Sequence, residues 1–110
     1  MPDNPTPALL VHNVYFTLND PSPEQRERLL EAIRTHLTGH PGVVFFAAGT
    51  PAEGLDRPVN DLDFHVALHI VFTNRQAHDD YQVSERHQQY IAENKDGWKQ
   101  VRVFDSVARN

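Results

Sequence analysis

Residues 64–72, FHVALHIVF, alternate large apolar side chains with smaller or polar ones at a period of two. This alternation is typical of a β-strand, because successive side chains of a strand point to opposite faces of the sheet. The segment predicts a strand with one continuous apolar face, and that face requires a covering layer from the rest of the chain. The predicted apolar face consists of Phe64, Val66, Leu68, Ile70 and Phe72, and the opposite face of His65, Ala67, His69 and Val71.

Three further segments have strand patterns. Residues 42–50, GVVFFAAGT, are apolar on both faces, so both faces of this strand must be covered. Residues 98–107, WKQVRVFDSV, form the last predicted strand, and residues 9–18 form the first. In the first strand His12, Val14, Phe16 and Leu18 share one face, and Val11, Asn13, Tyr15 and Thr17 share the other.

Helices are predicted between these strands. Ser22 as N-cap and Pro23 at the first helical position begin one helix, which ends before Gly39 and Pro41. Its apolar stripe consists of Leu29, Leu30, Ile33 and Leu37. A broken helical region over residues 74–96 completes the order βαββαβ. This order predicts an α+β fold of the ferredoxin-like type, with both helices on one face of an antiparallel sheet.

The opposite face of the predicted sheet is apolar and has no helix to cover it. Such a face marks an interaction surface, and a two-fold homodimer is the economical way to bury it. A domain this small buries a limited core, so pairing would also add stability. We expect a disordered lead-in over residues 1–8 and one domain over residues 9–110. The predicted interface carries Val11, Tyr15, Val44, Phe46, Ala67 and Val71.

Composition argues against several classes of partner. The formal charge is −5 and the basic residues are scattered singly, which disfavours nucleic acid. The sequence has no cysteine, so disulfides and thiolate ligands are unavailable, as is usual in the cytoplasm. No secretory signal or membrane span is recognised at the amino terminus. We expect a cytoplasmic protein.

The order and spacing of several short motifs resemble one known family. These are HNVYFTLND near the start, HPGVVFFAAGT in the second strand, the Tyr-x5-His spacing of YQVSERH, and WKQVRVFDS at the end. Together they are similar to the stress-responsive dimeric α/β-barrel domain, called Dabb, over residues 12–106. The resemblance implies a homodimer whose two sheets pack face to face, and a pocket in each protomer between sheet and helices.

The same resemblance suggests which residues line that pocket. A plant member, olivetolic acid cyclase, uses a Tyr-x5-His pair there for an aldol-type cyclisation. Tyr81 and His87 fall on those two positions, and His12 falls on a pocket histidine of the first strand. Family members often read His-Pro-x-His where this chain reads Ser-Glu-Arg-His, so only the second histidine of that motif, His87, is present.

Tyr81 and His87 can meet only if the helix between them is interrupted. Six residues of unbroken α-helix turn by about 600°, a net rotation of roughly 240°, which would point the two side chains to different faces. Ser84 is a good N-cap for a new helix starting at Glu85. His87 would then lie in the first turn, where the helix dipole and partial burial favour the neutral imidazole that a general base requires.

Three functions are consistent with these residues. The first is a Dabb protein of unassigned activity that holds a small apolar or aromatic ligand. The second is a cofactor-independent acid/base enzyme, such as a polyketide cyclase or isomerase, with His87 as base, Tyr81 as hydrogen-bond donor and His12 in support. The third is a haem-dependent monooxygenase or peroxidase with His87 and His12 as axial ligands. The predicted pocket lining is Phe16, Leu30, Leu68, Ile70, Tyr90, Val101 and Val103.

Structural roles are the alternative for all of these polar residues. A buried Tyr and His bonded to backbone or water need no chemistry. His65 and His69 are about 13 Å apart, too far for one ion within a single strand, so they are expected to be polar residues of the interface, with a metal site assembled across the dimer as the alternative. No metal and no cofactor is expected within one protomer. His78 is predicted on a solvated helix face, and Asp105 in a hydrogen bond to a neighbouring strand end. The polar loop over residues 51–63 is either turn chemistry or a lid.

Overall fold

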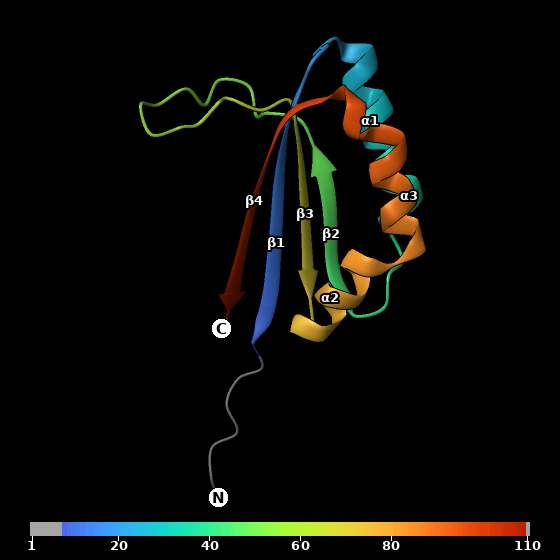
Figure 1. Cartoon of the computed structure of the whole chain (residues 1–110). Helices are drawn as coiled ribbons and strands as arrows, with labels where there is room; N and C mark the ends of the chain where they lie inside the picture. Colours follow the sequence, from blue (N-terminus) through green and yellow to red (C-terminus); the bar gives the residue numbers. More distant parts are fainter. Residues whose placement is uncertain (1–7, 110) are drawn as a thin grey trace, which may run out of the picture.

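The computed structural model describes residues 8–109 as one sheet with helices on one side (Figure 1). The strands are β1 Leu9–Leu18, β2 Val43–Gly49, β3 Val66–Phe72 and β4 Trp98–Ala108. The helices are α1 Pro23–His36, α2 Arg75–Val83 and α3 Glu85–Asn94, followed by the short 3-10 helix Lys95–Gly97. The predicted order βαββαβ is confirmed, with the second helix divided in two. Residues 1–7 of the predicted lead-in lie outside the described residues.

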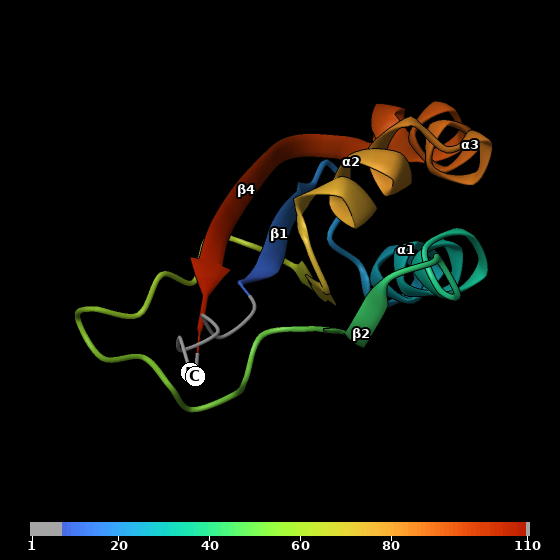
Figure 2. The same cartoon turned by 90° about the horizontal axis from the view of Figure 1, so that it is seen from below.

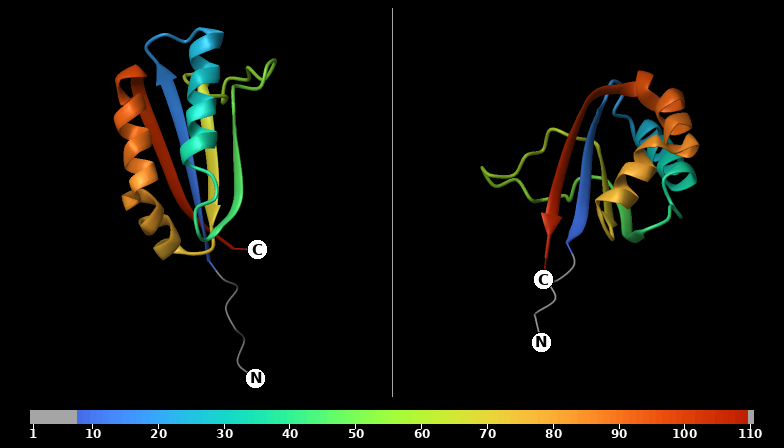
Figure 3. Two further views of the ribbon diagram at one scale, coloured as in Figure 1. Left: turned by 90° about the vertical axis from the view of Figure 1, so that its right-hand side faces the viewer. Right: turned by 60° about the horizontal axis from the view of Figure 1, so that its bottom comes forward.

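The sheet is antiparallel with strand order β2-β3-β1-β4, and all three helices cover the same face (Figure 2, Figure 3). This confirms the predicted ferredoxin-like α+β architecture. β1 is central, and its residue His12 lies opposite Ile70 of β3 and Asp105 of β4. The topology therefore brings together, beside the helices, residues from the beginning and the end of the chain.

The hydrophobic core lies between the sheet and the helices. Ile33 and Leu37 are fully buried under β3, whose residues Val66, Ile70 and Phe72 are also fully buried. These side chains come from the predicted helical stripe and the predicted apolar strand face, so both patterns are confirmed. Ser22 accepts a hydrogen bond from the Gln25 amide and caps α1 as expected.

The face assignment of β2 was wrong. Val43 pairs with Phe72 and Phe45 pairs with Val71, so Val44 has no ladder partner among the described residues and forms a β-bulge. A bulge inserts one residue and resets the alternation. Phe46, predicted on the open face, instead packs against the core, while Phe45 is on the open face and 55% exposed. Val44 itself is exposed within the bulge.

The other residues predicted on the open face are placed as expected. Val11, Tyr15 and Val71 lie on the sheet face opposite to the helices, as does Ala67, which pairs with Tyr15. Phe64 differs from the prediction, since β3 begins at Val66. The Phe64 ring packs 5.0 Å from that of Tyr15 on the open face, measured between centroids.

Candidate ligand-binding site

A cavity of about 160 Å³ lies between β1, β4 and the helices α2 and α3. Eight of the ten predicted site residues border it: His12, Phe16, Leu68, Tyr81, His87, Tyr90, Val101 and Val103. The other two do not. Leu30 and Ile70 are buried in the core and do not line this cavity.

The helix interruption that was predicted at Ser84 is confirmed. Ser84 has an extended backbone and its hydroxyl oxygen accepts a hydrogen bond from the His87 amide at 3.2 Å. The same hydroxyl donates to the Tyr81 carbonyl at 2.8 Å, so one side chain links the end of α2 to the start of α3. The turn places the Tyr81 and His87 rings edge to face, with centroids 4.7 Å apart.

The cavity wall favours neutral side chains. Burial, together with smaller contributions from the neighbouring His12, His40 and His78, lowers the pKa of His87 to about 4. Burial likewise raises the pKa of Tyr81 and of Tyr90 above the ordinary tyrosine range. At neutral pH this wall therefore offers an uncharged imidazole and two uncharged phenols.

Three residues that line this cavity each have a buried polar side-chain atom without a hydrogen-bond partner within the described residues. These atoms are His87 Nδ1, Tyr90 Oη and Trp98 Nε1. Buried polar atoms are usually paired, so three such atoms around one cavity indicate a polar ligand or solvent. Trp98 packs against Phe16 and Tyr90, at centroid distances of 5.1 and 5.6 Å. Trp98 was not predicted as a site residue, although it begins a strand and lies opposite the core residue Leu18.

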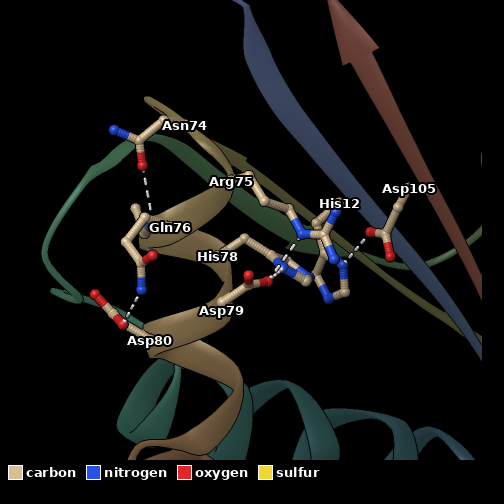
Figure 4. Close-up of polar contacts among 9 residues, drawn as sticks. His12, Asn74, Arg75, Gln76, His78, Asp79, Asp80 and Asp105 are labelled. Atoms are coloured by element: carbon tan, nitrogen blue, oxygen red, sulfur yellow. Dashed lines mark hydrogen bonds and ion pairs between the residues drawn. The ribbon is translucent and has the colours of Figure 1, made fainter.

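His12 belongs to a second polar group at the same cavity. Its Nδ1 lies 2.5 Å from Asp105 Oδ1, and its ring centroid lies 5.1 Å from that of His78 (Figure 4). Burial lowers the pKa of His12, and the bond to Asp105 opposes that effect. The prediction for His78 was wrong, because its side chain is 13% exposed and faces the sheet. Asp105 does bond to the neighbouring strand β1, but the contact is with the His12 side chain and not with the end of that strand.

Other histidines have structural partners. His40 donates to the His36 carbonyl at 2.8 Å and so caps the end of α1. His65 Nδ1 accepts a hydrogen bond from the Leu18 amide, and His69 Nδ1 lies 2.8 Å from the Asn13 side-chain oxygen. These contacts account for the side chains of His40, His65 and His69 without a ligand.

A larger hollow, about 520 Å³, lies on the open sheet face under the loop between β2 and β3. Arg102 holds this loop through Asp61, at 2.6 Å, and through the Asp63 carbonyl. The loop projects on the side of the sheet away from the helices, so it is not a lid for the histidine cavity (Figure 1, Figure 3). This hollow lies on the sheet face that we expect to form the dimer interface. The smaller cavity, with its cluster of titratable groups, is therefore the candidate site.

Solved structures share this fold over nearly the whole chain. A Dabb family protein with a ferredoxin-like fold from Mesorhizobium loti is 21% identical, with TM-score 0.76, covering 94% of this chain and 99% of that one. A dimeric ferredoxin-like protein of unknown function from Thermobifida fusca is 19% identical, with TM-score 0.75 and 92% of both chains covered. Hydroxynitrile lyase from Passiflora edulis is 16% identical, with TM-score 0.74, covering 94% and 96%. At these identities the likeness concerns the fold.

No curated protein matches the chain. Within residues 8–109, no helix is long and apolar enough to cross a membrane.

The sequence itself identifies the family. Residues 10–108 match the Stress responsive A/B Barrel Domain, abbreviated Dabb. Since this match spans both the four-stranded sheet and the cavity, the chain belongs to the Dabb family.

Proposed function

We propose that this Dabb protein is a homodimer that binds a small aromatic or apolar molecule in the cavity between sheet and helices. The observation that carries the proposal is the set of unpaired polar atoms of His87, Tyr90 and Trp98, three residues of a mostly apolar wall. A ligand oxygen could accept from Trp98 Nε1 and from the Tyr90 hydroxyl, which would recover the cost of leaving both groups buried without partners.

The volume limits the ligand to about one ring. A cavity of about 160 Å³ is close to the roughly 150 Å³ that accommodates benzene in an apolar protein interior. We infer a single aromatic or aliphatic ring that carries a carbonyl or hydroxyl oxygen. A haem group is much larger than this cavity, so the axial-ligand hypothesis for His87 and His12 receives no support.

The dimer is supported by the open sheet face and by relatives. Tyr15, Phe45 and Phe104 are large side chains on or beside that face, and the last two are more than half exposed. Solved neighbours from Thermobifida fusca and Bacteroides fragilis are described as dimeric. Pairing through this face would leave the histidine cavity of each protomer on the outer, helix-covered side.

Trp98 makes the ligand proposal directly measurable, because it is the only tryptophan of the chain and lines the cavity. Titration with ring-sized phenols, aldehydes and ketones should give a saturable change in its fluorescence for at least one compound. The Tyr90→Phe variant keeps the ring that packs on Trp98 but removes the hydroxyl. We expect it to bind that compound about 3-fold to 10-fold more weakly, the value of one hydrogen bond.

Tyr15→Phe is the matched control, since it makes the same change on the opposite sheet face. Its affinity for the ligand should equal that of the unmodified protein. Equal affinities of the Tyr90→Phe variant and the unmodified protein would contradict the role of the Tyr90 hydroxyl. The absence of any saturable change across the compounds would contradict the binding proposal as a whole.

A cofactor-independent acid/base reaction is the second candidate. The contact between Tyr81 and His87 favours it, because a neutral imidazole beside a phenol can take a proton from a carbon acid while the phenol donates to the enolate oxygen. The structural similarity to a hydroxynitrile lyase is consistent with chemistry of this type on the same fold. The proton would move from the carbon next to the ligand carbonyl to a nitrogen of His87.

Deuterium exchange at that carbon, followed by NMR in heavy water, tests the reaction without knowledge of the product. We expect His87→Ala to slow protein-catalysed exchange by about 100-fold or more. The rate should fall as the pH is lowered through about 4, where His87 becomes protonated. Exchange that is unchanged in His87→Ala would reject His87 as the base, whereas ligand binding without exchange would leave only the first proposal.

A further inference from the structure

Three side chains from separate elements form a compact group beside the cavity. His12 is on β1, Asp105 is directly opposite on β4, and His78 is on α2. Each offers one nitrogen or oxygen atom, and the three atoms lie within 4.8 Å of one another (Figure 4). Because the residues are far apart in the sequence and have no motif spacing, no metal site was predicted from them.

The surroundings of His78 provide a second, independent observation. Its Nδ1 lies 2.9 Å from Asp79 Oδ1, and the same oxygen accepts from Arg75 Nε at 3.0 Å. Metal-binding histidines commonly donate their other ring nitrogen to a carboxylate, which fixes the tautomer and the ring orientation. The contact with Asp79 assigns the proton of His78 to Nδ1 and leaves Nε2 as a free lone pair.

We propose that His12, His78 and Asp105 bind a divalent transition-metal ion of the Zn²⁺ class at the edge of the cavity. Two imidazole nitrogens and one carboxylate suit Zn²⁺ or Co²⁺, whereas Mg²⁺ and Ca²⁺ prefer oxygen ligands throughout. On binding, the ion takes the place of the proton that joins His12 to Asp105, and the neutral imidazole of His12 keeps its single proton on the ring nitrogen that does not bind the ion. Three protein ligands leave a fourth position for water or a ligand oxygen.

Packing holds the two imidazoles in place for this role. The Phe72 ring lies next to both, with centroids 6.4 Å from His12 and 5.6 Å from His78. His12 is 4% exposed, so the surrounding side chains fix the position of its ring. Asp105 is the accessible member, with a side chain 42% exposed, so an ion could enter from the outer edge of β4.

The competing explanation is a hydrogen-bonded pair in which Asp105 only orients His12. Titration of the chelator-treated protein with Zn²⁺ by calorimetry, and with Co²⁺ by visible absorption, separates the two. We expect one ion per chain with a dissociation constant in the micromolar range or tighter. His78→Ala should weaken binding at least 10-fold, since His78 has no part in the pair. Asp105→Asn, which can still accept a hydrogen bond from His12, should weaken it similarly.

Asp79→Asn tests the supporting carboxylate and should reduce affinity by about 10-fold to 100-fold. His36→Ala is the matched control, because His36 also has an acidic neighbour, Glu93 at 3.6 Å, but lies outside the group. Its affinity should equal that of the unmodified protein. Failure to bind either ion, or equal affinity in His78→Ala, would overturn the proposal. The titration uses the ions alone, so its outcome is independent of the organic ligand.

Discussion

His87 combines burial with a position where protonation is unfavourable. It lies in the first turn of α3, is 8% exposed, and has three histidines near enough to disfavour its positive charge. The unfolded chain has no such environment, so its His87 titrates near the ordinary value of 6.5 while the folded value is about 4. Between these two values the unfolded state binds more protons than the folded state.

Stability should therefore fall as the pH is lowered from 7 to 5. One pKa unit corresponds to about 1.4 kcal/mol, so His87 alone should reduce the free energy of unfolding by about 2 kcal/mol over that range. Urea unfolding at several pH values measures this loss. His87→Gln removes the titration and should flatten the profile, with His12 accounting for the remaining slope. An unchanged profile in His87→Gln would contradict the lowered pKa.

Individual site residues were predictable where sequence spacing carried the signal. Tyr81 and His87 could be paired because Ser84 is a recognisable N-cap between them. Trp98 and His78 were missed for physical reasons. His78 is followed directly by Asp79 and Asp80, a pattern that favours a solvated face, and the packing of α2 against β1 decides that this side chain is buried. An unpaired indole nitrogen such as that of Trp98 is visible only in three dimensions.

At the scale of elements, the site depends on the division of one helical region into α2 and α3. Ser84→Ala removes both hydrogen bonds of the Ser84 hydroxyl, the one to the Tyr81 carbonyl and the one from the His87 amide. We expect a loss of about 1 kcal/mol in the free energy of unfolding, as is usual for an N-cap. Because α2 and α3 would be less firmly joined, ligand affinity at Trp98 should also fall.

Ser22→Ala provides the comparison for Ser84→Ala. It removes the N-cap of α1, whose hydroxyl accepts from the Gln25 amide at 3.3 Å, far from Tyr81 and His87. Urea unfolding should show a similar loss of stability, but ligand affinity should not change. Equal effects of the two variants on affinity would mean that the Ser84 turn acts only through global stability.

The elements themselves followed closely from the sequence, since β1, α1 and the start of α3 begin where they were predicted. Alternation and capping residues carry that information locally. β2 shows the limit, because its predicted faces assumed an uninterrupted period of two. A run of apolar residues, GVVFFAAG, contains no polar residue that would reveal where the alternation is reset.

At the scale of the whole molecule, substitutions at the adjacent residues Phe45 and Phe46 distinguish dimer formation from folding of the protomer. Phe45 is exposed on the open face, whereas Phe46 packs against the core. Phe45→Asp should give a folded monomer on a sizing column, because it places a charge in the proposed interface. Phe46→Asp should instead cost several kcal/mol and yield unfolded or aggregated protein. A dimer retained in Phe45→Asp would reject this face as the interface.

The bulge at Val44 also determines which changes in chain length the sheet can tolerate. Val44 occupies no rung of the ladder, so its deletion would leave Val43 opposite Phe72 and Phe45 opposite Val71. Deletion of Phe45 would also remove the bulge, because Val44 would then occupy the position opposite Val71 and Phe46 would stay opposite Ile70. Both single-residue deletions would thus keep Phe46 and the later residues of β2 on their present faces, and would differ only in the side chain that is exposed opposite Val71.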